Sequence, residues 1–377
     1  MLRLPQLDGL RGLTAVYVVL HHAWLTIWPA RNGVIGFDAP LVTGVLAYGH
    51  FAVAVFIVLS GFCLGAPLAR NGWRLRGGAV GFLRRRARRI LPPYYAAVAF
   101  SLLLIATRIG GETGSHWDIS VPVDATGLAA SLLLVQNVLG QSQINHVFWS
   151  IAVEAQIYVL FPLLVLVAAR RGARAAVLVA AVATGALLVL VGALPVVGPL
   201  VLAGLTPQFL LLFAIGMGAA AVAARGRGGH WGRWALLGLA LLAVLCAVLG
   251  REGMLTNLVW LDVLAGLATA SALIALCTKP QTRTARVLAV RPLAGLGLFA
   301  YSIYLVHAPV LQLVWLEWIA PLGLEDGTDF LLLLAAGVPV ALAVSYGFFL
   351  VFERPFLGRP RRAEPGAAGA LAARSYS

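Results

Sequence analysis

LAYGHFAVAVFIVLSGFCLGA, residues 46–66, contains no Asp, Glu, Lys or Arg. A transmembrane α-helix needs about 20 consecutive, mostly apolar residues, so this run is long enough to cross a bilayer. Similar runs recur along the chain at about 10–29, 91–108, 148–168, 174–194, 199–223, 232–250, 255–277, 293–317 and 328–352. The sequence therefore predicts an all-α, polytopic integral membrane protein with about ten transmembrane helices.

The composition supports the same class. Of the 377 residues, 61% are hydrophobic and 11% are charged, whereas a soluble domain carries roughly 25% charged residues. One water-soluble core cannot cover this much apolar surface. A further apolar stretch near 125–140 is interrupted by Ser131, Gln136 and Asn137, and we expect it in an outer loop as an interfacial helix.

The net charge of +14 has a topological explanation. On a soluble protein it would suggest nucleic-acid binding, but here the basic residues stand in short segments between apolar runs, so we expect no nucleic-acid partner. Cys63, Cys246 and Cys277 lie far apart within apolar runs. They form neither a disulfide framework nor a zinc-binding spacing, and we expect no metal.

The distribution of basic residues predicts that both termini are cytoplasmic. With the N-terminus inside, only Arg31, Arg108 and Arg251 of the 28 Lys and Arg residues fall outside, as the positive-inside rule requires. Residues 1–358 are expected to form one transmembrane domain. Residues 359–377, rich in Ala, Gly, Arg and Pro, are expected to form a disordered, basic cytoplasmic tail.

Ionisable residues inside the membrane are costly and indicate functional sites. The candidates are His21, His22, Glu154, Asp262 and His307. In LDGLRGLTAVYVVLHHA, residues 7–23, Arg11 and His22 lie on one helix face, about 16 Å apart along the axis. Imidazole is suited to proton transfer near neutral pH. The alternative is a histidine that hydrogen-bonds a neighbouring helix for packing.

A second set of polar residues lies on one face of the helix at 148–168. Ser150, Glu154 and Tyr158 follow i, i+4 spacing. Counting from the outer helix ends places Glu154 and His22 at about the same depth, roughly 10 Å below the boundary. We expect Glu154 to orient His22 and to stabilise its charged form. A purely structural pair, or a protonated Glu154, is the alternative.

Five arginines stand in GFLRRRARRILPPYY, residues 81–95, at the cytoplasmic entrance of the third predicted helix. They are Arg84, Arg85, Arg86, Arg88 and Arg89. This is more charge than topology needs, and guanidinium groups bind phosphates in bidentate fashion. The alternative is contact with anionic lipid head groups.

These segments, with VAVFIVLSGFCLG, YSIYLVHAP and FERPF, together resemble the membrane acyltransferase 3 family along nearly the whole chain. Members of that family O-acylate bacterial surface carbohydrates, lipids or secreted small molecules. Ala155 stands where many members carry a second acidic residue, and Val306 where an aromatic residue is common before the histidine. Neither difference removes a proposed catalytic group.

The resemblance implies a multi-pass enzyme of the bacterial inner membrane that takes an acyl group, expected to be acetyl, from cytoplasmic acyl-CoA. His22 would act as general base with Glu154 as its partner, or would itself form an acyl-histidine intermediate. The expected donor-binding residues are Arg11, Arg85, Arg86, Arg88 and Arg89, and the expected substrate contacts are Ser150, Tyr158, Tyr301 and His307.

The acceptor would be a hydroxyl of a carbohydrate, a glycolipid or a small molecule such as a macrolide, with membrane lipids as further partners. A proton-coupled transporter or flippase is a second reading of the intramembrane His and Glu residues. A non-catalytic membrane scaffold is a third, and it would tolerate His22→Ala.

Overall fold

The computed structural model describes residues 4–31, 34–35, 39–193, 204–226 and 229–357. Its only strands within these residues form a two-residue antiparallel ribbon of β1 (Ala30–Arg31) and β2 (Val34–Ile35). All other regular structure is helical, which confirms the predicted all-α class. The helices are α1 (Pro5–Ile27), α2 (His50–Ala69), α3 (Gly78–Leu104), α4 (Ala125–Leu132), α5 (Trp149–Arg171), α6 (Ala173–Gly192), α8 (Gln208–Ala224), α9 (Trp231–Thr256), α10 (Leu258–Thr278), α11 (Arg283–Leu288), α12 (Arg291–Leu298), α13 (Ala300–Val314), α14 (Asp326–Leu332) and α15 (Val338–Phe348).

Eight helical segments of the described chain are long and apolar enough to cross a membrane. They are Leu41–Ala69, Gly78–Ile109, His146–Arg171, Ala173–Leu190, Trp231–Gly250, Leu258–Thr278, Ala300–Leu322 and Asp326–Phe356. The other two predicted spans correspond to α1 and α8. Helix α1 is long enough, but Arg11, His21 and His22 reduce its apolar character. Helix α8 is a shorter apolar helix of 17 residues, and the start of its predicted span, 199–203, lies outside the described residues.

Two predicted boundaries are wrong in an informative way. The arginines were expected in a loop, but α3 begins at Gly78 and carries them on the helix. Leu, Ala and Arg are good helix formers, so the helix extends well beyond its apolar part. The run 293–317 was expected to be one helix, but it breaks at Phe299 between α12 and α13. The stretch near 125–140 does contain a short helix, α4.

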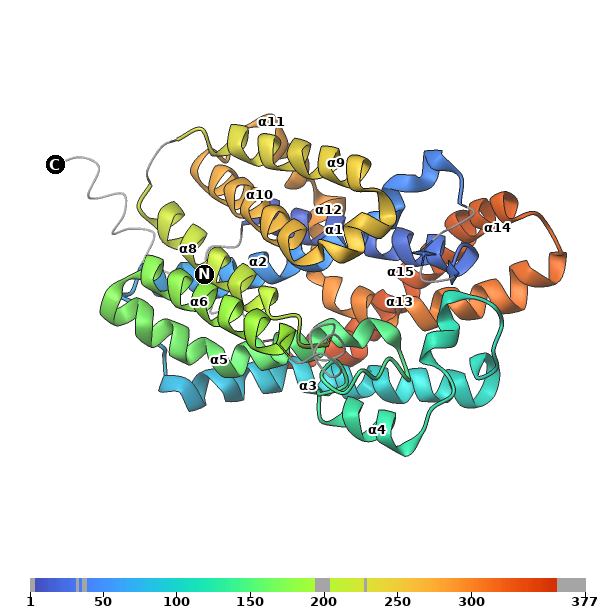
Figure 1. The fold of residues 1–377 in the computed structure, drawn as a ribbon. Coiled ribbons are helices and arrows are strands. Elements are labelled where there is room, and N and C mark those ends of the chain that lie inside the picture. Colours follow the sequence, from blue (N-terminus) through green and yellow to red (C-terminus); the bar gives the residue numbers. More distant parts are fainter. Residues whose placement is uncertain (1–3, 32–33, 36–38, 194–203, 227–228, 358–377) are drawn as a thin grey trace.

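Helices α1 and α2 lie in the middle of the bundle, with α9 and α10 on one side and α3 and α5 on the other (Figure 1). Helix α2 approaches α8 closely at two glycines. A Cβ on Gly61 would lie 2.1 Å from the backbone oxygen of Phe213, and one on Gly216 would lie 2.1 Å from that of Val58. Small residues permit such contact between membrane helices.

The N-terminus of α13 is held by a carboxylate from the end of the chain's helical part. Glu353 accepts hydrogen bonds from the backbone N–H of Ser302, at 3.1 Å, and from its hydroxyl, at 2.6 Å. A negative charge at a helix N-terminus is favourable because the first N–H groups have no partner within the helix. This contact fixes the start of the helix that carries His307.

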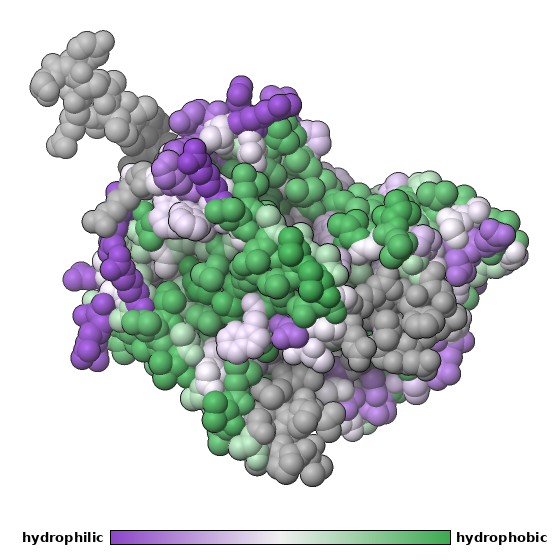
Figure 2. All heavy atoms as spheres, turned by 45° about the horizontal axis from the view of Figure 1, so that its top comes forward, coloured by the Kyte–Doolittle hydropathy of each residue, from purple (hydrophilic) through white to green (hydrophobic). Residues whose placement is uncertain are grey.

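Large apolar side chains face outward on the peripheral helices. Leu178 and Val182 on α6 and Leu236 and Val244 on α9 are all more than half exposed. Figure 2 shows a broad apolar face with hydrophilic residues gathered towards its borders. A polytopic membrane protein has this surface, because lipid rather than water covers its sides.

Candidate active site

Four histidines from four separate segments lie close together, and three of them, His22, His116 and His146, line one small cavity. His22 lies on α1, His307 on α13, and His116 and His146 on two 3₁₀ turns, His116–Ser120 and His146–Phe148. The ring centroids of His22 lie 4.9 Å from His307 and 5.3 Å from His146, and those of His116 and His146 lie 4.7 Å apart. We call these four residues the histidine cluster.

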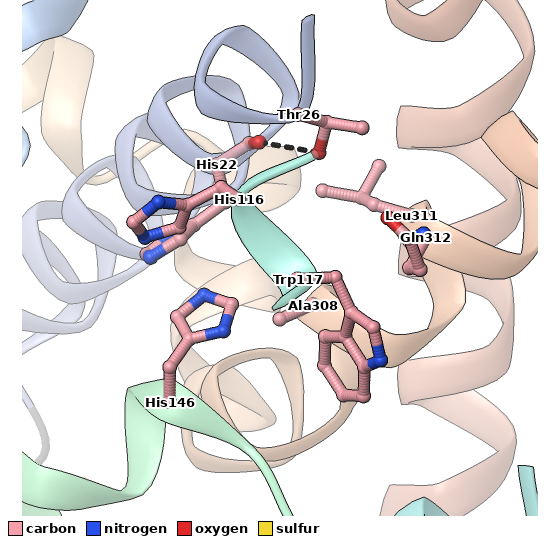
Figure 3. Close-up of a pocket in the computed structure, with 8 residues that line it drawn as sticks. All are labelled: His22, Thr26, His116, Trp117, His146, Ala308, Leu311 and Gln312. Carbon is pink, nitrogen blue, oxygen red and sulfur yellow. Dashed lines mark hydrogen bonds between the residues drawn. The ribbon is translucent and has the colours of Figure 1, made fainter. Parts of the chain in front are cut away.

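The cavity has a volume of about 10 Å³, which is room for about one water molecule. Figure 3 shows the side chains of His22, His116 and His146 gathered on one side of it and those of Trp117, Leu311 and Gln312 on the other. Its lining residues are His22, Thr26, His116, Trp117, His146, Ala308, Leu311 and Gln312.

Hydrogen bonds define the tautomer of each ring in the His307–His22 pair. Nδ1 of His307 lies 2.9 Å from the backbone oxygens of Ile303 and Tyr304. Both are acceptors, so this nitrogen carries the proton and Nε2 of the neutral ring is an acceptor. Nε2 lies 3.1 Å from Nδ1 of His22, which is also 2.9 Å from the oxygen of Val18. Nδ1 of His22 therefore donates.

The remaining nitrogen of His22 is a free base. Because Nδ1 carries the proton, Nε2 of the neutral ring holds a lone pair. No described residue hydrogen-bonds this nitrogen. The arrangement has the logic of a catalytic triad, in which a fixed acceptor orients the imidazole and leaves its other nitrogen available. Here the fixed acceptor is His307.

His116 adds a second neutral ring to the wall of the cavity. It lies on a connecting segment outside the candidate spans. Burial lowers the pKa of His116 to about 4, because desolvation penalises the charged imidazolium. His116 is therefore uncharged at neutral pH. Neither His116 nor His146 was predicted as a site residue, because both lie outside the predicted apolar runs.

The predicted contact between Glu154 and His22 is wrong in this structure, since His307 occupies that position. Glu154 Oε1 instead accepts a hydrogen bond from Ser60, at 2.8 Å, and another from Tyr158. The contact with Tyr158, one turn along α5, follows the predicted i, i+4 geometry. Glu154 is thus the centre of a separate polar group on α2 and α5.

Ser150 joins the histidine cluster through an intermediate tyrosine. Its hydroxyl lies 2.6 Å from that of Tyr304, which donates to the backbone oxygen of Val147 at 3.0 Å. The ring of Tyr304 lies 6.0 Å from that of His307. Tyr301, the other tyrosine expected near substrate, donates to the backbone oxygen of Ile90 at 3.2 Å and ties α13 to α3.

Asp262 belongs to neither group. It is fully buried on α10 and accepts from Gln208 at 3.0 Å, and its Oδ2 lies 3.1 Å from Nε2 of His50. No pattern in the sequence indicated His50 as its partner.

The arginines of α3 differ in their surroundings. Arg84, Arg85, Arg88 and Arg89 are exposed, and Arg85 donates to the backbone oxygen of Arg76 at 2.7 Å. Arg86 is half-buried over the ring of Phe82, which in turn lies 4.8 Å from the ring of Phe161 and 6.2 Å from that of Tyr158. This contact connects the arginine-bearing end of α3 to the Glu154 group.

Arg11 is held within the protein. It donates to Asp8 at 2.8 Å and to the sulfur of Cys63 at 3.5 Å, and its side chain is 28% exposed. Within the described residues, no group of three or more His, Cys, Asp or Glu side chains has the geometry to hold a metal ion. In the histidine cluster, two of the ring nitrogens are committed to the His22–His307 hydrogen bond.

Comparison with known proteins gives one match. A family model described as an acyltransferase domain of the acyltransferase 3 family matches residues 4–350, nearly the whole chain. No curated protein and no solved structure matches it.

Proposed function

The chain belongs to the acyltransferase 3 family and is an acyltransferase, and from this premise we propose that it moves an acetyl group from acetyl-CoA to a carbohydrate hydroxyl. The observation that carries the proposal is the free Nε2 of His22, held at the cavity by the hydrogen bond from Nδ1 to His307. A base of this kind is what an acceptor hydroxyl requires.

In the proposed reaction, Nε2 of His22 takes the proton of the acceptor hydroxyl while its oxygen attacks the thioester carbonyl carbon. A C–O bond forms and the carbonyl oxygen becomes an oxyanion. When the intermediate collapses, the C–S bond breaks and the CoA sulfur leaves with the proton from Nε2. His307 keeps Nδ1 of His22 hydrogen-bonded throughout, so the imidazolium is oriented and stabilised.

The donor's phosphates are proposed to bind the exposed arginines of α3. Arg85, Arg88 and Arg89 present guanidinium groups at the surface, and Arg86 connects them to Tyr158 through Phe82. From there Glu154, Ser60 and Ser150 supply polar groups along α2 and α5 towards Tyr304. We propose that the pantetheine arm follows these groups, and that Glu154 and Tyr158 contact it.

The decisive experiment measures CoA release from acetyl-CoA by purified protein in lipid nanodiscs, with a panel of sugar acceptors. We expect His22→Ala to reduce kcat by at least about 10³-fold, because the base is lost and a triad member of this type contributes on that scale. His230→Ala, an exposed histidine at the start of α9, is the matched control and should behave as wild type.

The alternatives make different predictions. A proton-coupled transporter would carry a glycan across a vesicle membrane in response to a pH gradient without consuming CoA. An acyl-histidine mechanism would leave acetate on His22 in protein quenched without acceptor, detectable by peptide mass spectrometry. Transfer by His22→Ala at the wild-type rate would eliminate the proposed base.

A further inference from the structure

His146 lines the cavity and carries a hydrogen-bond donor that the general-base mechanism does not use. His146 is 9% exposed, and its Nε2 is buried with no hydrogen-bond partner in the structure. Buried polar groups are paired in the great majority of cases, and an unpaired one costs stability. An unpaired nitrogen on a residue that lines a cavity therefore indicates that a bound group completes its hydrogen bonding.

The serine beside His146 defines which nitrogen carries the proton. Nδ1 of His146 lies 2.9 Å from the hydroxyl oxygen of Ser120. That oxygen already accepts the backbone N–H of His146, at 3.1 Å. Nδ1 is the one acceptor that the described residues offer to the Ser120 hydroxyl, so the hydroxyl donates to it. The neutral ring then carries its proton on Nε2.

Most of the other polar side chains of the lining already donate a hydrogen bond within the protein. Three of them donate to acceptors within the protein, at 2.8 to 3.0 Å: Thr26 to the backbone oxygen of His22, Trp117 to that of Ile109, and Gln312 to the hydroxyl of Thr113. No hydrogen bond from the described residues defines the tautomer of His116. His146 is thus the ring of the lining whose donor is both defined and unused.

The two rings that face each other have opposite roles. His22 presents a lone pair and His146 an N–H, and their centroids lie 5.3 Å apart beside a cavity with room for about one oxygen-sized group. We propose that His146 is a second catalytic residue, which donates Nε2–H to the thioester carbonyl oxygen and stabilises the oxyanion formed on attack. This inference rests on the proposed acyl transfer.

In this step the hydroxyl oxygen forms its bond to the carbonyl carbon and its proton moves to Nε2 of His22. The electron pair of the C=O π bond moves to the carbonyl oxygen, which accepts the hydrogen bond from His146. Collapse restores C=O, breaks C–S and releases CoA as the thiol with the proton from His22. His146 keeps its own proton throughout, as an oxyanion-hole donor does.

The test compares two substitutions of similar size, His146→Gln, which retains an N–H donor, and His146→Met, which has none. We expect Met to reduce kcat by about 10²-fold with KM for acetyl-CoA within about threefold of wild type, the usual loss for one oxyanion donor. Gln should retain at least about tenfold more kcat than Met. Ser120→Ala removes the hydroxyl that holds the proton of His146 on Nε2. It should lower kcat severalfold at unchanged KM.

The outcomes separate this inference from the proposed function. Equal kcat for the Gln and Met variants, or a loss confined to KM, would overturn the role of His146 while His22→Ala still established the base. A wild-type protein that transfers no acyl group would remove both. Melting temperature and gel-filtration profile identify a variant that is merely misfolded, and Ser120→Ala then decides, because it leaves His146 in place.

Discussion

His307 is the residue on which the chemistry of His22 depends most directly. Two backbone carbonyls of its own helix hold the proton on its Nδ1, which turns its Nε2 into a fixed acceptor for His22. A carboxylate usually has this role in a triad. A neutral imidazole orients its partner in the same way without placing a second charge in the site.

Removing this acceptor should affect the rate and not substrate binding. In His307→Leu we expect kcat to fall by about 10²- to 10⁴-fold, since His22 can then adopt the wrong tautomer, while KM for acetyl-CoA changes little. In His307→Gln the side-chain oxygen can accept from Nδ1 of His22, so part of the rate should return. The measurement is steady-state CoA release. If Gln and Leu are equally slow, orientation is not the role of His307.

Glu154 illustrates what residue-level reasoning could find. The spacing of Ser150, Glu154 and Tyr158 predicted one polar face of a helix, and the hydrogen bond between Glu154 and Tyr158 agrees with it. The similar membrane depth of Glu154 and His22 did not predict contact between them. Depth does not define which face of each helix points towards the other helix. The hydrogen-bond partner of Glu154 is Ser60, on α2, and not His22 as predicted.

At the scale of single elements, α3 combines two functions in one helix. Its first turns carry exposed arginines, and its later turns bury Tyr94, Ala97 and Val98 in the bundle. A rigid helix holds the guanidinium groups in a constant relation to the bundle, which a mobile loop would not. This suits the recognition of a ligand whose phosphates remain outside while its acyl end enters.

The exposed arginines of α3 should govern donor affinity. For Arg88→Ala/Arg89→Ala we expect KM for acetyl-CoA to rise by about tenfold or more with kcat nearly unchanged, because charge-assisted phosphate contacts are lost. The wild-type KM should also rise with salt, which screens exposed charges. The matched control is Arg283→Ala/Arg286→Ala on α11, which removes two arginine charges that are also exposed. Equal effects of the two double variants would contradict a specific phosphate site.

The whole molecule orders its polar groups along the bundle. The arginines lie at the start of α3, the Glu154 group lies along α2 and α5, and the histidine cluster lies where α1, α13 and two connecting turns meet. If the positive-inside prediction is correct, these positions run from the cytoplasm inward. The donor would then enter at the arginines and its acyl group would reach His22.

Topology can be measured by cysteine labelling of intact cells. In a variant with Cys63, Cys246 and Cys277 replaced by Ala, the exposed positions Gln281 and Ser142 are each changed to Cys. A membrane-impermeant maleimide should label Ser142→Cys in intact cells, and Gln281→Cys only after the cells are opened. Labelling of Gln281→Cys in intact cells would reverse the predicted orientation. Retained CoA release by both variants serves as the folding control.

The sequence by itself determined the membrane class, the helical architecture and most spans, and it identified histidine, carboxylate and arginine residues as site candidates. These properties are local: hydropathy over about 20 residues and a period of 3.6 residues are visible in any window of the chain. The break at Phe299 and the extension of α3 before its apolar part were not predicted, because apolar content does not define where a helix begins or ends. The tail at 359–377 lies outside the described residues.

Only the tertiary structure decided which groups meet. His22 and His307 are separated by 285 positions. His116 comes from a connecting segment, and His146 begins the segment His146–Arg171, just before the apolar run predicted at 148–168. Their convergence depends on which faces of α1, α13 and the two turns are packed together, and packing depends on the shapes of many side chains at once. Local patterns therefore identified His22 as a candidate base, but not the ring that orients it or the donor opposite it.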